Sequence, residues 1–194
     1  MQGGSQNDVA YQTIDSVPMV PILEEGQLAL SLTWSNQWYD MDVVVEFDVS
    51  PDVKCRVNYA NRECGAVRMI LDNSMEHKRS SADIVLFDQV DRETLYLVYV
   101  NLSTLRMKQK HSASFDLSKG VLKVYSPFYD WPVLQLHAPQ VPNGSQDSNW
   151  VAFCMVGGLG LKGIVPVNTV SKSRPNVQAA CGEIEQRAAQ GLIF

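Results

Sequence analysis

The chain has 194 residues, a mass of 21.6 kDa, a formal net charge of −5 and a sequence pI of about 5.1. Hydrophobic residues make up 45% and charged residues 19% of it, which is the balance of a globular domain with a buried core. The acidic balance and the scattered Lys and Arg residues argue against binding to nucleic acid. No apolar run reaches about 18 residues, so the sequence predicts no transmembrane segment.

The N-terminal sequence MQGGSQND is polar and has no apolar stretch like that of a secretory signal. This predicts an intracellular, cytoplasmic protein, with a cytoskeletal or membrane-peripheral complex as further locations. Four cysteines stand at positions 55, 64, 154 and 181, with no CxxC motif. In an intracellular chain they are expected to be reduced thiols, with Cys154 in the core. The three histidines are far apart, which argues against a zinc site.

The chain divides into three segments. Residues 1–24 form an irregular N-terminal arm with several apolar residues, residues 25–168 form the domain, and residues 169–194 form a C-terminal extension. No internal repeat and no low-complexity tract interrupts them.

The domain segment consists of short runs with the patterns of strands. Leu28, Leu30, Leu32 and Trp34 alternate with small or polar residues, as in a strand buried on one face. The β-branched run at 41–47 predicts a central strand buried on both faces. Turn signals separate the further runs, which are 53–59, 66–71, 83–88, 95–102, 120–125, 132–138 and 150–156. The predicted fold is all-β: a two-sheet β-sandwich of about nine or ten strands with an N-terminal arm and a short C-terminal helix.

Residues 176–189 are the best helix candidate. Their Ala, Glu, Gln and Arg residues favour a helix, and Val177, Ala180, Cys181 and Ile184 share one stripe at helical spacing. Pro175 suits the start of this helix, and Gly191 suits its end.

Acidic side chains gather at the predicted strand ends. Asp40 and Asp42 open one strand, Asp72 and Asn73 close another, and Asp83 opens the next. Clustered oxygen ligands of this kind are what hard cations such as Ca²⁺ require. The alternative for Asp40 and Asp42 is that they are solvated at the end of the strand or cap the turn after Trp38 and Tyr39.

The order of the motifs resembles the tellurium-resistance (TerD-type) domain family over residues 25–165. The segments that carry the resemblance are LSLTW, YDMDVVVEF, RVNYAN, CGAVRMILDN, SADIVLFDQV, LYLVYVNL and NWVAFCMVGGLG. The resemblance implies a calcium-binding β-sandwich with ligands at Asp40, Asp42, Asp72 and Asn73, and an acidic residue at Asp83. The loop after Asn73 departs from the family pattern, because Lys78 and Arg79 place positive charge where the family has acidic residues. A related group of sandwich domains with an "LTW…DLDL" start is almost as similar.

No catalytic motif stands out. The segment Gly158–Gly163 matches GxGxxG, but an extended segment with Pro166 follows it, where a dinucleotide site needs a helix. Paired carboxylates could serve a glycosidase, with aromatic residues such as Trp34, Trp38, Tyr39 and Trp131 as platforms, but no glycosidase signature accompanies them. The sequence therefore predicts that the protein is not an enzyme.

Three functional hypotheses follow. The leading one is a non-catalytic interaction subunit of an intracellular multiprotein assembly, which contacts other proteins through the N-terminal arm and the C-terminal helix. The alternative use for both termini is to cover open edges of their own domain. The second hypothesis is a calcium-responsive binding module of the stress-response type, with Ca²⁺ as the only cofactor. The third is a hydrolase that uses paired carboxylates.

Overall fold

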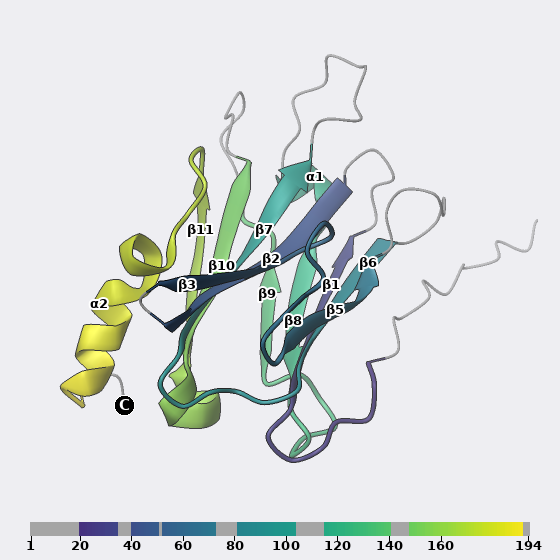
Figure 1. Cartoon of the computed structure of the whole chain (residues 1–194). Coiled ribbons are helices and arrows are strands. Elements are labelled where there is room, and N and C mark those ends of the chain that lie inside the picture. The colour runs from purple at the N-terminus through teal and green to yellow at the C-terminus, as the bar shows by residue number, and fades with distance from the viewer. Residues whose placement is uncertain are drawn as a thin grey trace, which may run out of the picture.

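A computed structural model describes residues 20–34, 40–50, 52–72, 81–103, 115–140 and 148–191. Two antiparallel sheets of six and five strands pack face to face in these parts of the chain, and a helix lies against the outer side of the smaller sheet (Figure 1). The predicted two-sheet β-sandwich with a short C-terminal helix is confirmed.

The larger sheet, sheet A, has β1 near its middle. Its order is β4 (Glu63–Cys64), β5 (Val67–Asp72), β6 (Ser81–Phe87), β1 (Leu28–Trp34), β8 (Val121–Tyr125) and β9 (Leu134–His137). The alternating pattern of β1 turns its leucines and Trp34 into the core, where Leu30 and Leu32 are at most 1% exposed.

The smaller sheet, sheet B, has its most buried strands at its centre. Its order is β11 (Ile164–Ser171), β10 (Asn149–Val156), β7 (Leu95–Ser103), β2 (Asp40–Ser50) and β3 (Val53–Val57). Strand β2 is buried from Asp40 to Phe47, so the prediction of a strand covered on both faces is confirmed, but β2 lies next to the edge strand β3 and not at the centre of the sheet. β3 pairs with β2 only from Val45 onward, so the first half of β2 lies at an edge of sheet B.

The main core lies between the two sheets. Phe47, Phe87 and Tyr96 pack together there, with the Tyr96 ring centroid 5.0 Å from that of Phe47 and 5.5 Å from that of Phe87. Aliphatic residues from both inner faces surround these rings. Such a continuous apolar layer supplies most of the driving force for folding of a domain this size.

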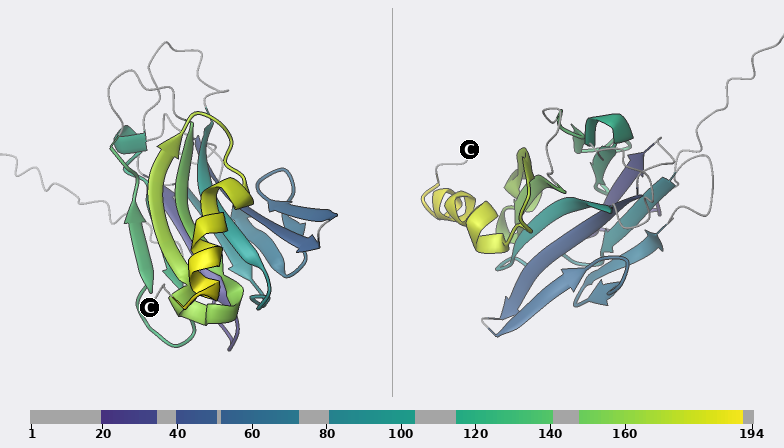
Figure 2. Two further views of the ribbon diagram at one scale, coloured as in Figure 1. Left: turned by 90° about the vertical axis from the view of Figure 1, so that its left-hand side faces the viewer. Right: turned by 90° about the horizontal axis from the view of Figure 1, so that it is seen from above.

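Helix α2 (Val177–Ala189) covers the outer face of sheet B (Figure 2). Its N-cap is Asn176, whose Oδ1 accepts the N–H of Ala179 at 2.8 Å, and Gly191 follows its end with φ +68°. Val177 and Cys181 pack with Val44, Tyr99 and other residues of β2, β7 and β10 in a second apolar cluster. The predicted helix is confirmed, and its apolar side is occupied by its own sheet.

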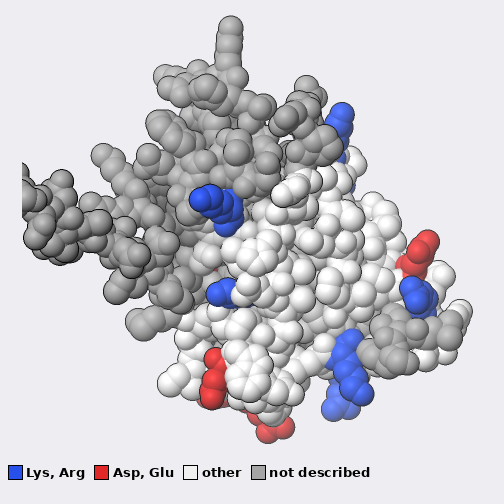
Figure 3. All heavy atoms as spheres, turned by 180° about the vertical axis from the view of Figure 1, so that it is seen from behind, with Lys and Arg blue, Asp and Glu red and all other residues white. Residues whose placement is uncertain are grey.

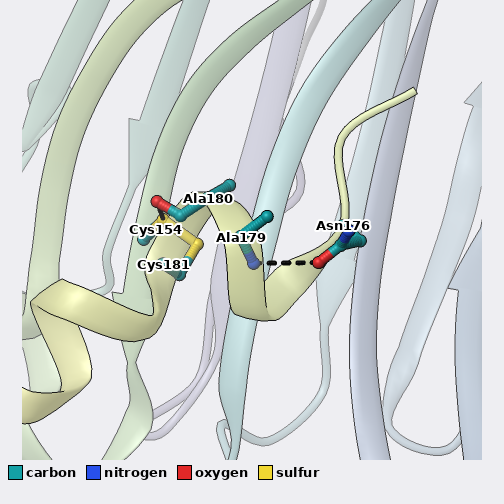
Figure 4. The surroundings of a disulfide bond; sticks show 5 residues. All are labelled: Cys154, Asn176, Ala179, Ala180 and Cys181. Carbon is teal, nitrogen blue, oxygen red and sulfur yellow. Dashed lines mark hydrogen bonds between the residues drawn. A yellow bond between two sulfur atoms is a disulfide. The ribbon is translucent and has the colours of Figure 1, made fainter. Parts of the chain in front are cut away.

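All four cysteines form disulfides, and the expectation of reduced thiols is wrong. Cys55 in β3 pairs with Cys64 in β4, and thus joins the two sheets at their edges. Cys154 in β10 pairs with Cys181 in α2, beside the cap of the helix (Figure 4). Cys154 lies in the core, as predicted, but it also fastens the helix to the sheet.

Several elements differ from the predictions. The two-residue strand β4 and the edge strand β11 bring the number of strands in the described parts to eleven. A helical turn α1 (Phe115–Ser118) precedes β8. The glycine-rich segment forms the 3₁₀ segment η1 (Gly157–Gly163), and the extended strand β11 follows it, so this GxGxxG match has no dinucleotide-binding helix behind it.

The Cys154–Cys181 disulfide closes a longer loop than Cys55–Cys64, with a sequence separation of 27 against 9. Loop-closure entropy then predicts that the double change Cys154→Ala and Cys181→Ala lowers the free energy of unfolding by about 3–4 kcal/mol. The matched control, Cys55→Ala with Cys64→Ala, should cost about 2–3 kcal/mol. Urea denaturation under non-reducing conditions measures both. Equal stability of all three proteins would contradict the prediction.

Burial raises the pKa of Tyr99, which packs beneath α2. Its side chain is fully buried and its hydroxyl donates to Glu46 Oε1 at 2.8 Å. Burial first, and then the Glu46 carboxylate, raise the pKa of Tyr99 from 10.0 to about 12. In that interval the folded protein keeps a proton that the unfolded chain loses, so the free energy of unfolding falls as pH rises.

Replacement of Tyr99 by Phe should therefore make the loss of stability above pH 10 less steep. The check is to compare urea midpoints of the two proteins at several values between about pH 9 and 12. Tyr59→Phe is the control, because Tyr59 is exposed. Parallel curves for Tyr99→Phe and the unmodified chain would show that Tyr99 carries no such linkage.

Candidate metal centre

Three aspartates from both sheets come together where β2 and β6 begin and where β5 ends. They are Asp42 of β2, Asp72 of β5 and Asp83 of β6, and one carboxylate oxygen of each lies within 4.8 Å of the others. Asp42 is 7% exposed and Asp83 is 1% exposed, while the Asp72 side chain is 13% exposed. Three carboxylates so close together and so far from water repel one another unless a positive charge or a proton intervenes.

A β-bulge directs Asp72 to this place. The register between β5 and β6 shifts between Met69 and Leu71, which leaves Leu71 38% exposed and sets Asp72 directly opposite Asp83. Without the extra residue, period-2 alternation would put Leu71 on the same face as Met69 and turn Asp72 away from it. The bulge therefore exchanges an apolar residue for a carboxylate at the end of the sheet.

Asp83 ties the two sheets together. Its Oδ2 accepts the backbone N–H of Val43 at 3.1 Å. Val43 lies in the part of β2 that β3 does not reach, so the edge of sheet B is hydrogen-bonded by a side chain of sheet A. This contact brings Asp42, the neighbour of Val43, to the other two carboxylates.

Arg62 approaches the cluster from the solvent side. Its Nη2 lies 2.7 Å from Asp72 Oδ2, and its side chain is 56% exposed. The turn after β3 brings it there, since the carbonyl of Arg62 accepts the N–H of Met69 at 2.7 Å. One guanidinium offsets one of the three negative charges, and it would share Asp72 with any bound cation.

The carboxylates lie close enough together to share one Ca²⁺. Calcium–oxygen bonds are about 2.3–2.6 Å long, so oxygens on opposite sides of one ion are about 4.6–5.2 Å apart. Magnesium, with bonds of about 2.0–2.1 Å, requires a tighter arrangement. The three oxygens, all within 4.8 Å of one another, are therefore close enough for one Ca²⁺ to contact all three.

Of the five predicted ligands, the structure brings together Asp42, Asp72 and Asp83. Asp40 is buried in the same strand, at 7% exposure, but does not belong to the group of three. Asn73 lies outside the described residues, as do Lys78 and Arg79 of the loop that departs from the family pattern. Sequence reasoning missed Arg62, because its meeting with Asp72 depends on how the turn folds back on β5.

Of the aromatic residues considered as platforms for a glycosidase, Trp34 and Trp131 lie in the described parts of the chain. Trp34 is buried in the core at 4% exposure. Trp131 follows β8 at the opposite end of the sandwich, since Val121 of β8 pairs with Thr33 and Tyr125 with Ala29. Trp38 and Tyr39 lie outside the described residues.

Comparison of the chain with protein-family models, with curated proteins and with solved structures finds no match. The resemblance to TerD-type domains therefore stays a prediction that rests on the order of the motifs.

The hydrogen bond between Val43 and Asp83 can be tested apart from any metal. Asp83→Ala leaves a buried N–H without its acceptor, which should lower the free energy of unfolding by about 1–3 kcal/mol. Asp83→Asn is the matched control, since its amide oxygen can still accept the bond while one charge is removed. Chemical denaturation in the presence of a chelator should then rank Asp83→Asn well above Asp83→Ala. Equal losses would show that the charge, and not the hydrogen bond, sets the stability here.

Proposed function

We propose that this protein is a non-catalytic binding module whose β-sandwich holds Ca²⁺ at Asp42, Asp72 and Asp83. The observation that carries the proposal is the convergence of three largely buried carboxylates from two sheets within 4.8 Å. An ion at this point would join β2 to β5 and β6 and so stabilise one end of the sandwich. Calcium would thereby act on the conformation of the domain, as in a calcium-responsive module.

The burial of the carboxylates favours a binding role over hydrolysis. A general acid and base must reach the substrate, and Asp42 and Asp83 expose at most 7% of their surface. The described part of the face seen from behind shows its Lys and Arg side chains apart from one another rather than in a basic patch (Figure 3). The described part of this face therefore favours partners other than nucleic acid.

The disulfides support an oxidising environment in place of the intracellular location that the sequence suggested. Structural disulfides persist mainly in secreted, extracellular or equivalent compartments. Calcium sites of extracellular modules are weak, with dissociation constants of about 10⁻⁴–10⁻³ M. A site with three carboxylates and a competing arginine suits that range. None of the helices in the described residues is long and apolar enough to span a membrane.

The interaction subunit of an assembly remains the second candidate. Its motivation was the pair of apolar termini, but the apolar side of α2 packs on the chain's own sheet B. The first 19 residues and Leu192–Phe194 lie outside the described residues. The pairing of Arg62 with Asp72 favours this candidate, because it supplies one positive charge to the cluster without any metal.

The first experiment is a calcium titration of chelator-stripped protein, followed by heat and by melting temperature. At ten times the dissociation constant, bound Ca²⁺ should add about 1.4 kcal/mol to the free energy of unfolding. Asp42→Asn should abolish both signals, because it removes one of the three carboxylates that would bind the ion. Arg62→Gln should bind Ca²⁺ more tightly.

Asp52→Asn is the control, since it makes the same charge change at an exposed position of the β2–β3 turn. Magnesium chloride at equal ionic strength separates calcium binding from a salt effect. Absence of heat and of any thermal shift, or an equal shift in Asp42→Asn, would leave the interaction subunit as the better proposal.

A further inference from the structure

A second charged site lies away from the aspartates, where α2 begins. A hollow of about 370 Å³ opens there between the β2–β3 hairpin and the start of the helix. Its charged lining consists of Lys54, Arg56 and Arg174 on the positive side and of Glu46 and Asp48 on the negative side. In a chain with a net charge of −5, this is a local excess of positive charge.

Glu46 organises the arginines from beneath. Its side chain is only 10% exposed, and its Oε1 lies 3.2 Å from Arg56 Nε and accepts hydrogen bonds from Arg174 Nε at 3.0 Å and Nη2 at 2.5 Å. The same oxygen accepts the Tyr99 hydroxyl. One buried carboxylate oxygen thus holds two guanidinium groups side by side. Because the two arginine side chains are already ordered, they lose less conformational entropy when a ligand binds.

These arginines have more donors than Glu46 can use. A guanidinium group carries five N–H donors in a planar fork. The Nε of Arg56 forms an ion pair with Glu46 at 3.2 Å, but within the described parts of the chain this buried N–H makes no hydrogen bond. Arg56 and Arg174 remain 37% and 56% exposed, so their terminal N–H groups can be reached from the hollow.

The start of α2 adds backbone N–H donors, whose partial charge is positive like that of the arginines. Val177 and Gln178 line the hollow, and their backbone N–H groups belong to the first turn of a 13-residue helix, where no intrahelical acceptor exists. Asn176 Oδ1 takes the N–H of Ala179, one residue further along. The positive end of the helix dipole therefore points to the place where the arginines converge.

We propose that this hollow binds an oxyanion group, a carboxylate or a phosphate, between Arg56, Arg174 and Lys54. Such groups match the planar fork of arginine and are held by charge-assisted hydrogen bonds. The ligand would bridge β3 and α2, two elements that are each fastened by a disulfide. The site is independent of the proposed calcium centre, since it shares no residue with it.

The test is calorimetric titration of the full chain with sodium phosphate and, separately, with sodium acetate, in calcium-free buffer at constant ionic strength. Saturable heat is expected with at least one of them, with a dissociation constant on the order of 1 mM. Arg56→Gln should weaken binding at least tenfold. Binding of phosphate alone would assign a phosphoryl ligand, and binding of acetate alone a carboxylate.

Arg68→Gln is the matched control, because Arg68 is an arginine paired with Asp88 in sheet A, away from the hollow. It should leave the dissociation constant unchanged. Lys54→Gln changes an exposed residue of the lining and keeps the test decisive if Arg56→Gln does not fold. No saturable heat with either anion, or full affinity in both Arg56→Gln and Lys54→Gln, would overturn the proposal.

Discussion

Strand β2 is buried on both faces, and both candidate sites depend on this constraint. Met41, Val43, Val45 and Phe47 point into the core between the sheets, whereas Val44 packs beneath α2. A shift of β2 by one residue would turn every side chain to the opposite face of the sheet. Apolar side chains would then leave the core between the sheets, and polar side chains would enter it. The register of β2 therefore fixes where Asp42 and Glu46 stand, at the end of the sandwich and under the helix.

The two sites resolve the cost of buried charge in different ways. Glu46 is surrounded by donors, since two arginines and Tyr99 converge on one of its oxygens. Asp42, Asp72 and Asp83 instead face one another, and Arg62 pairs with Asp72 at the rim. A buried acid with arginines around it is satisfied by the protein itself, whereas a cluster of acids requires a cation from solution or a proton. That contrast is the physical reason to assign cation binding to one site and anion binding to the other.

The sequence predicted those parts of the fold that local pattern determines. Alternation predicted β1, the β-branched run predicted β2, and residue preference with the Asn176–Gly191 boundaries predicted α2. The proximity of Asp72 and Asp83 could be expected only from the family resemblance, because it depends on a β-bulge that the residue types in β5 do not predict. The Glu46 network joins residues 46, 56, 99 and 174, which only the three-dimensional arrangement brings together. The expectation of reduced cysteines is wrong because it rests on the N-terminal sequence, whereas pairing depends on which strands and helices become neighbours.

Disulfides and calcium belong together in one physical setting. The Cys55–Cys64 link joins sheet B to sheet A at one edge, and the proposed Ca²⁺ at Asp42, Asp72 and Asp83 would join the sheets near the start of β2. The disulfide is stable only where thiols are oxidised. A weak calcium site would be occupied only where calcium is abundant. Both conditions hold outside the reducing interior of a cell. A chain that reached such surroundings would gain both cross-links between its sheets, and in a reducing, calcium-poor environment it would have to rely on the apolar core and the Val43–Asp83 hydrogen bond to hold them together.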